Sequence, residues 1–158
     1  MPRLSVLVPA YNAAETIAAA LRSTLAALPR DAEIVVLDDG SSDATADVSR
    51  ATSDTRVRVI SRSNAGVAAT LTELLAVTDS ELVARMDADD LVLPGRLRRQ
   101  LRAIESGADA VFTTVVTFGS GVPGLPRPSG IAAAEFGLHL LLTNPVAHST
   151  MLARRSTI

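Results

Sequence analysis

Acidic side chains form two short clusters, and each cluster directly follows an apolar, β-branched run. One cluster follows residues 34–37 and the other follows residues 82–86, and together they hold Asp38, Asp39, Asp87, Asp89 and Asp90. Carboxylates brought close together repel one another, and a bound divalent cation removes that repulsion. Oxygen ligands suit Mg²⁺ or Mn²⁺, which proteins usually hold with one or two carboxylates plus substrate phosphates. The clusters therefore predict a site for a metal–diphosphate ligand rather than a site for proton transfer alone.

A second group of polar residues follows two further apolar runs. Tyr11 and Asn12 come after the first run of the chain, and Asn64 and Gly66 come after the third. If the runs are parallel strands, their carboxyl ends meet at one edge of the sheet, where ligands of open α/β sheets bind. Tyr11 offers a flat face to a nucleotide base, and a neighbouring carboxylate could accept a base N–H. The simpler alternatives are a half-buried aromatic for Tyr11 and a helix cap for Asn12, with Glu15 completing a capping box.

The elements that must position these residues alternate along the chain. Apolar residues at helical spacing, bounded by Pro29, Pro94 and Gly107, predict helices between the apolar runs. This order predicts an α/β fold, a Rossmann-like, mostly parallel sheet with helices on both faces in three layers. The expected strands span residues 4–8, 34–37, 57–60, 82–86 and 110–118, and the expected helices carry residues 17–28, 44–51, 67–77 and 97–104.

The C-terminal part of the chain has a different pattern. Residues 119–130 are rich in glycine and proline, which predicts a surface loop or a lid over an acceptor. Residues 131–142 predict a weak helix, in which His139 is expected to be a core or surface histidine. Asn144-Pro145 ends that helix, and residues 146–152 predict one more strand.

Composition excludes several classes of protein. The chain has 158 residues, 47% apolar and 20% charged, so we expect one folded domain over residues 1–158 and no extended disorder. The formal net charge of −2 leaves no basic footprint for nucleic acid. The absence of cysteine excludes disulfides and thiolate metal sites. No apolar run reaches the roughly 18 residues of a membrane span, so we expect no transmembrane segment and a cytoplasmic location.

Three common motifs are missing from the sequence. It contains no Walker A loop, no G-x-G-x-x-G turn and no G-x-S-x-G elbow. P-loop NTPases, Rossmann dehydrogenases and α/β-hydrolases are therefore poor interpretations. A diphosphate in this protein must be neutralised by the cation rather than by a glycine-rich helix start.

Five segments, taken in order, resemble the family-2 glycosyltransferases, which have the GT-A fold. The D-x-D motif alone is common, whereas all five segments at the spacing of the family are specific. They cover most of residues 3–156 and read LSVLVPAYNAAETI, EIVVLDDGSSDAT, RVRVISRSNAGVAATL, ELVARMDADDLVLPGRLRRQ and NPVAHSTMLARRS.

The resemblance implies roles for residues on the nucleotide side of the site. Asp39, with Asp38 beside it, would hold the base or the ribose, and Tyr11 would lie against the base. The residues implied in nucleotide binding are Pro9, Ala10, Tyr11, Asp38, Asp39, Asn64, Gly66, Asp87 and Ala88.

The resemblance also implies roles on the diphosphate side. Asp87-Ala88-Asp89 would be the D-x-D motif, with Asp87 facing the ribose and sugar and Asp89 binding the cation, Mn²⁺ or Mg²⁺. Asp90 would support this turn. His148 would lie near the diphosphate end.

The activity implied is inverting transfer of a sugar from a nucleotide-diphosphate sugar, with UDP favoured, to an acceptor hydroxyl in polysaccharide or cell-envelope glycan synthesis. In the family, an Asp or Glu base downstream of the histidine segment deprotonates the acceptor. No acidic residue follows Glu135, so we expect this base beyond Ile158 and regard the chain as the truncated donor-binding portion of an enzyme. The alternative is a nucleotide-sugar-binding fragment without turnover. Relatives with the ARMDADD variant usually carry Leu-Asn at Leu71-Thr72, so no polar contact is assigned to that helix.

Other interpretations remain open at the level of sequence. Asp87 and Asp89 could form a plain acidic turn, and Asp90 could act only on the dipole of the next helix. Arg96 is grouped with Arg98, Arg99 and Arg102 as a solvated helix face. A sugar-1-phosphate nucleotidyltransferase ranks low because its glycine-rich N-terminal loop is missing. The acceptor, whether glycan, lipid or protein, is left open. Apolar surface exposed on a truncated half would favour a homo-oligomer. Membrane association through a partner or through a missing segment is also left open.

Overall fold

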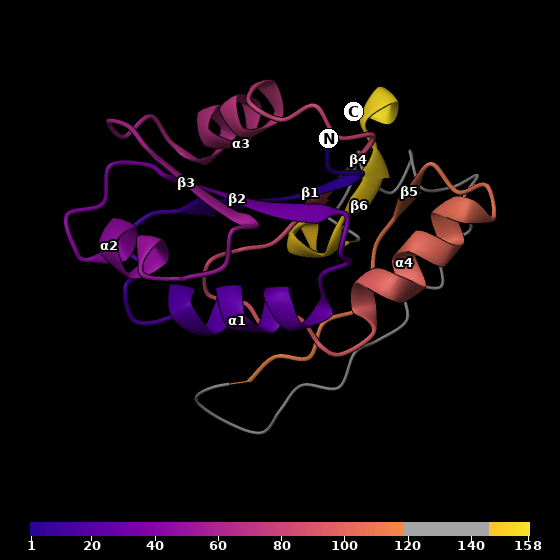
Figure 1. Cartoon of the computed structure of the whole chain (residues 1–158), viewed down its shortest axis with the longest axis horizontal. Helices are drawn as coiled ribbons and strands as arrows, with labels where there is room; N and C mark the ends of the chain where they lie inside the picture. The colour runs from indigo at the N-terminus through magenta and orange to yellow at the C-terminus, as the bar shows by residue number, and fades with distance from the viewer. Residues whose placement is uncertain (119–145) are drawn as a thin grey trace.

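The computed structural model describes residues 1–118 and 146–158, which form one α/β unit (Figure 1). The expected loop or lid at residues 119–130, the helix at residues 131–142 and His139 lie outside the described residues. The elements are β1 (Leu4–Ala10), α1 (Ile17–Ala27), β2 (Ala32–Asp38), α2 (Thr45–Arg50), β3 (Val57–Ser61), α3 (Val67–Ala76), β4 (Leu82–Arg85), α4 (Arg96–Glu105), β5 (Ala110–Val111), η2 (His148–Thr150), β6 (Leu152–Arg154) and η3 (Arg155–Thr157).

The six described strands form one sheet in the order β3-β2-β1-β4-β6-β5. Strands β1, β2, β3 and β4 pair in parallel, whereas β6 runs antiparallel to both β4 and β5. The chain builds outward from β1 to β3 and then crosses to β4 on the other side of β1. The strand order therefore reverses between β1 and β4, and the crevice at such a switch point is where open α/β sheets bind ligands.

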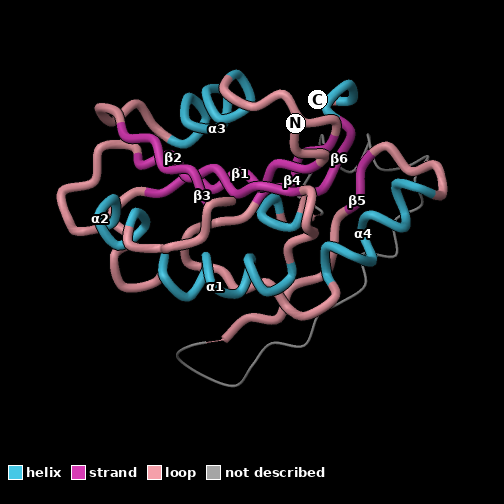
Figure 2. Tube along the Cα trace, viewed as in Figure 1, coloured by secondary structure: helices cyan, strands magenta, loops and turns pink. Residues whose placement is uncertain are grey.

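Helices cover both faces of the sheet, as the sequence predicts. Helix α3 lies over one face, and α1, α2 and α4 lie on the other side (Figure 1, Figure 2). Alternate residues of β1 and β2 point to opposite faces, so both faces of these strands are apolar. The set on the α1 side comprises Val6, Val8, Ile34 and Val36, and the set on the α3 side comprises Leu7, Val35 and Leu37.

Two expected strands near the C-terminus are wrong in extent. Strand β5 ends at Val111 instead of reaching residue 118, and β6 begins at Leu152, after the η2 turn. Hydrogen bonds from side chains connect the segment after β5 to the η2 turn, where no strand pairing forms. The amide of Gln100 donates to the carbonyls of Val111 at 3.1 Å and Thr150 at 2.6 Å, and the Thr113 N–H donates to the Thr150 hydroxyl at 3.0 Å.

The expected helix cap at Asn12 is also wrong. Helix α1 begins at Ile17, so Asn12 lies too far upstream to cap it, and no capping box forms with Glu15. Asn12 instead has a φ of 48°, in the left-handed region. Its side-chain oxygen accepts a hydrogen bond from the Ser42 N–H at 2.9 Å, so Asn12 joins two loops rather than starting a helix.

Replacement of Gln100 by leucine tests this side-chain bridge. Gln100 is 1% exposed, so Gln100→Leu would leave the Thr150 carbonyl buried without its donor. We expect the free energy of unfolding to fall by about 2 kcal/mol, measured by urea denaturation. The control is Arg99→Leu at the neighbouring exposed position of α4, which should change stability by no more than about 0.5 kcal/mol. Equal losses in the two variants would contradict the bridge.

Candidate functional site

A cleft of about 620 Å³ opens at the carboxyl ends of the parallel strands. The loops that follow β1, β2, β3 and β4 all contribute to its lining, as expected for the switch point of the sheet. The sequence-predicted residues that it brings together are Pro9, Ala10, Tyr11, Asp39, Asn64, Gly66, Asp87, Ala88 and Asp89.

Three predicted residues do not line this cleft. Asp38 is buried, and its carboxylate accepts the Ser41 N–H at 3.2 Å within the turn after β2. Asp90 closes a turn by donating its N–H to the Asp87 carbonyl at 3.2 Å. His148 lines a second cavity of about 310 Å³, which is mostly apolar and which shares Arg85 with the cleft.

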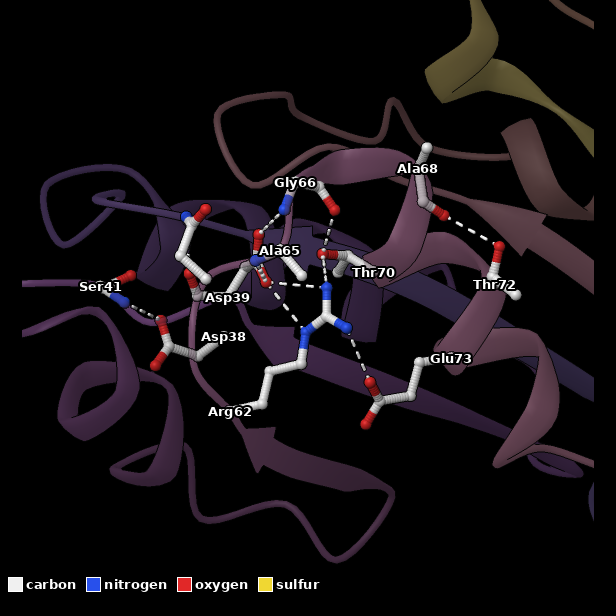
Figure 3. Close-up of polar contacts among 11 residues, drawn as sticks. Asp38, Asp39, Ser41, Arg62, Ala65, Gly66, Ala68, Thr70, Thr72 and Glu73 are labelled. Atoms are coloured by element: carbon white, nitrogen blue, oxygen red, sulfur yellow. Dashed lines mark hydrogen bonds and ion pairs between the residues drawn. The ribbon is translucent and has the colours of Figure 1, made fainter.

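Asp39 is the most densely bonded residue of the cleft (Figure 3). Its side chain is buried, and its Oδ1 accepts hydrogen bonds from Arg62 Nε at 2.9 Å and from the Ala65 N–H at 3.0 Å. Arg62 Nη2 lies 2.8 Å from the same oxygen. Oδ2 accepts the Gly66 N–H at 2.8 Å. Backbone N–H groups of the loop after β3 thus bind the carboxylate that follows the end of β2.

These contacts keep Asp39 ionised. Burial alone would raise the pKa of its carboxyl, but the hydrogen bonds from Ala65, Gly66 and the Arg62 guanidinium outweigh burial and lower that pKa below its ordinary value. At neutral pH Asp39 is therefore an acceptor with no proton to donate.

Arg62 is a residue that sequence reasoning missed. Its guanidinium also contacts α3, through Nη2 to the Thr70 hydroxyl at 2.8 Å and through Nη1 to Glu73 Oε2 at 2.9 Å (Figure 3). Helix α3 thus contributes polar contacts after all. Thr72, at the position that departs from the family, only donates to the Ala68 carbonyl of its own helix.

Hydrogen bonds join the loop after β1 to the loop after β2 and to the start of α2. The Asn12 N–H donates to the Ser41 hydroxyl at 2.9 Å, and the Ala13 N–H donates to the Thr45 hydroxyl at 2.7 Å. Ser42 donates to Asn12 Oδ1 through its N–H at 2.9 Å and its hydroxyl at 3.3 Å, and the Ala14 N–H donates to Asp43 at 3.1 Å. This junction fixes the chain on either side of Tyr11, whose side chain stays 55% exposed at the cleft.

Asp43 anchors this junction and also lines the cleft. A hydrogen bond from the Thr45 hydroxyl is the main cause that lowers the pKa of Asp43. Burial opposes it, and bonds from the Ala14 and Thr45 backbone add to the lowering. Asp43 and Glu15 are two cleft carboxylates that sequence reasoning did not place there.

The two acids of the D-x-D turn have different surroundings. Asp87 is paired with Arg85, whose Nε and Nη2 donate to its two oxygens at 2.9 and 3.3 Å. Asp89 is exposed, and no residue of the described ranges forms a hydrogen bond or ion pair with its carboxylate. The sequence did hold a signal for Arg85, a charged residue inside the apolar run 82–86.

The carboxylate oxygens at the D-x-D turn suit a cation that is also coordinated by a bound ligand. Within residues 1–118 and 146–158, no group of three or more acidic or histidine side chains could enclose a metal ion. A single free carboxylate such as Asp89 suits Mg²⁺ or Mn²⁺ when substrate phosphates complete the coordination. The residues present therefore fit a metal–diphosphate ligand and do not fit a metal site made by protein alone.

Arg96 binds the backbone next to the D-x-D turn. The expectation that it lies on a solvated helix face is therefore wrong. Nη2 of Arg96 donates to the carbonyls of Arg85 at 3.1 Å and Ser149 at 2.8 Å. Burial lowers the pKa of Arg96, while the charges of Asp90 and Asp87 partly offset that effect. The other arginines of that group, Arg98, Arg99 and Arg102, are exposed as expected.

Comparison with known proteins agrees with this geometry. Residues 5–156 match the family described as glycosyl transferase family 2. The chain belongs to this family. It is 44% identical over 99 residues to the succinoglycan biosynthesis protein ExoU of Rhizobium meliloti, covering 61% of this chain and 29% of ExoU. It is 29% identical over 168 residues to the putative glycosyltransferase EpsE of Bacillus subtilis, covering 98% of this chain and 57% of EpsE.

Solved structures show the same GT-A fold. S. aureus TarS 1–349 in complex with UDP-GlcNAc superposes with a TM-score of 0.73 at 24% identity, covering 99% of this chain and 46% of TarS 1–349. Glucosyl-3-phosphoglycerate synthase of Mycobacterium tuberculosis, in complex with Mn²⁺ and UDP-glucose, gives 0.71 at 21% identity, with coverages of 98% and 57%. This chain of family 2 thus spans about half the length of the structures it matches. None of its described helices is long and apolar enough to cross a bilayer.

Replacement of Gly40 tests how closely the turn after β2 packs against the loop after β3, whose residues bind Asp39. Gly40 has a φ of +72°, and an added Cβ would lie 2.6 Å from the Asn64 backbone nitrogen and 3.2 Å from the Arg62 carbonyl oxygen. Gly107 has a φ of +103°, but a Cβ there would meet nothing within 4 Å. A positive φ at alanine lowers the free energy of unfolding by about 1 kcal/mol, and both variants carry this cost.

We expect Gly40→Ala to lower the free energy of unfolding clearly more than Gly107→Ala does, because only Gly40→Ala also forces two backbone segments apart. Urea denaturation of the two variants measures the difference. Equal losses would show that the loop after β3 is not packed tightly against the β2 turn.

Proposed function

We propose that this chain binds a nucleotide-diphosphate sugar in the cleft and provides the donor site of an inverting glycosyltransferase. UDP is the favoured nucleotide, and polysaccharide or cell-envelope glycan synthesis is the favoured setting. The observation that carries this proposal is the cleft itself, which joins an ionised, buried Asp39 and an exposed Tyr11 to the unpaired Asp89 at the switch point of the sheet. The complexes of TarS 1–349 with UDP-GlcNAc and of the M. tuberculosis synthase with Mn²⁺ and UDP-glucose support it.

The nucleoside lies between the loops after β1 and β3 in this proposal. The Tyr11 ring stacks on the base, because an exposed aromatic face at a cleft suits a flat heterocycle. Asp39 accepts a base N–H. Asn64 holds the loop that completes this pocket, since its side-chain amide donates to the Asp39 carbonyl at 2.9 Å.

The diphosphate lies toward the D-x-D turn. Asp89 holds the cation, Mn²⁺ or Mg²⁺, which when bound stabilises negative charge on the departing diphosphate. Arg85 offsets the charge of Asp87, so that the anionic ligand meets one unpaired carboxylate of this pair rather than two. Asp38, Asp90 and His148 lie outside the cleft lining and have no ligand contact in this proposal.

In the transfer step, an acceptor hydroxyl attacks the anomeric carbon on the face opposite the diphosphate. The bond from that carbon to the diphosphate oxygen breaks as the glycosidic bond forms, which inverts the configuration. An Asp or Glu takes the proton of the hydroxyl. We assign this base to no residue of the cleft and expect it from the acceptor-binding part of a longer protein.

The alternative is donor binding without turnover. It is favoured by the lining of the cleft, in which carboxylates are assigned to the nucleotide, the cation or a contact within the protein and none to the acceptor. In both cases we propose that residues 1–158 form a single nucleotide-sugar-binding unit. Binding of a UDP-sugar without release of UDP in the presence of acceptors would favour this alternative.

Replacement of Asp89 tests the assignment of the cation. We expect Asp89→Ala to weaken Mn²⁺-dependent binding of UDP at least about tenfold, because the variant removes the free carboxylate that the cation needs. Calorimetric titration of UDP with and without Mn²⁺ measures the effect. The control is Asp79→Ala, which removes an exposed carboxylate remote from the cleft lining and should leave the affinity unchanged. Metal-independent binding that survives in Asp89→Ala would contradict the assignment.

A further inference from the structure

The two oxygens of the Asp39 carboxylate are unequally occupied. Oδ1 has three donor nitrogens around it, two from Arg62 and one from Ala65, at 2.8 to 3.0 Å. Oδ2 has one donor, the Gly66 N–H at 2.8 Å. A carboxylate offers about four acceptor positions, two on each oxygen. Oδ1 is therefore full, and Oδ2 keeps one position for a ligand.

The free position lies on the cleft side of the carboxylate. Gly66, which binds Oδ2, lines the cleft, whereas Arg62 and Ala65, which bind Oδ1, do not. Thr70 and Glu73 hold the guanidinium in this place from α3 (Figure 3). Arg62 is only 19% exposed, so a ligand cannot easily displace it from Oδ1.

We propose that Arg62 is a positioning residue that limits Asp39 to one hydrogen bond with the base and thereby selects uracil over guanine. Uracil presents a single ring N–H between two carbonyl groups. Guanine presents a ring N–H and an amino group side by side, a pair that suits both oxygens of a free carboxylate. With Oδ1 full, the amino group of guanine finds no acceptor at Asp39. This inference rests on the proposed function, since it takes the cleft to be the nucleotide site.

Inosine diphosphate (IDP) gives a matched comparison with GDP, because hypoxanthine keeps the ring N–H of guanine and lacks only the amino group. We expect the wild-type chain, titrated with Mn²⁺ by calorimetry, to bind UDP most tightly and to bind IDP at least as tightly as GDP. Binding of GDP about tenfold more tightly than IDP would show that Asp39 accepts two bonds and would overturn the proposal. Failure to bind any of the three nucleotides would instead refute the proposed function.

Variants of Arg62 should change the ratio of the affinities for GDP and IDP. Arg62→Met leaves only the Ala65 N–H on Oδ1. The affinity for GDP relative to the affinity for IDP should therefore rise about tenfold over wild type. Arg62→Lys keeps the charge but cannot supply both nitrogens, so its GDP-to-IDP ratio should lie between the other two, and it carries the test if Arg62→Met does not fold. The control is Arg58→Met, which removes an arginine of β3 that contacts Glu33 and the Val77 carbonyl and not Asp39, and it should keep the wild-type ratio. An unchanged ratio in both Arg62 variants would overturn the proposal.

Discussion

The structure of the cleft depends on one buried carboxylate whose charge is balanced by donors from the protein. Asp39 lies at the end of β2, where its own N–H donates to the Ala10 carbonyl of β1 at 2.8 Å. Its side chain binds the loop after β3, and Arg62 extends the same network to α3. A buried charge without partners would be strongly destabilising. The need to satisfy Asp39 therefore brings together three strand ends and one helix that are far apart in sequence.

The D-x-D turn uses the opposite arrangement. There the two carboxylates separate into one paired with Arg85 and one open to solvent, and Arg96 ties the strand beneath them to α4 and η2. At the Asp39 end of the cleft the carboxylate is thus neutralised by protein, whereas at the D-x-D turn Asp89 keeps a negative charge that no residue of the described ranges pairs. Such a division suits a ligand that has a neutral heterocycle at one end and, at the other, a diphosphate that shares a cation with the protein.

Much of the fold and of the lining of the cleft could be predicted from the sequence. Strands β1, β2 and β4 have apolar runs that are mostly buried, and β3 at the edge of the sheet is half-buried or exposed. The residues after these four strands meet at one edge because the strands are parallel. What the sequence could not show are contacts that exist only after folding. Arg62, Arg96 and Gln100 lie within the segments that resemble the family, but the sequence assigned none of them a contact in the site, and each acts on residues that are brought near by the sheet. The run at 110–118 has strand-forming residues, but strand β5 ends at Val111, whose carbonyl accepts a hydrogen bond from the Gln100 side chain.

A crystal structure of the chain with UDP and Mn²⁺ would show whether Asp39 and Asp89 bind the two ends of the nucleotide. We expect the uracil ring against Tyr11, its N–H on Asp39 Oδ2, Arg62 still on Oδ1, and the cation at Asp89 beside the diphosphate. A base bound away from Asp39, or a complex in which Arg62 has left the carboxylate to make room for the base, would contradict this expectation.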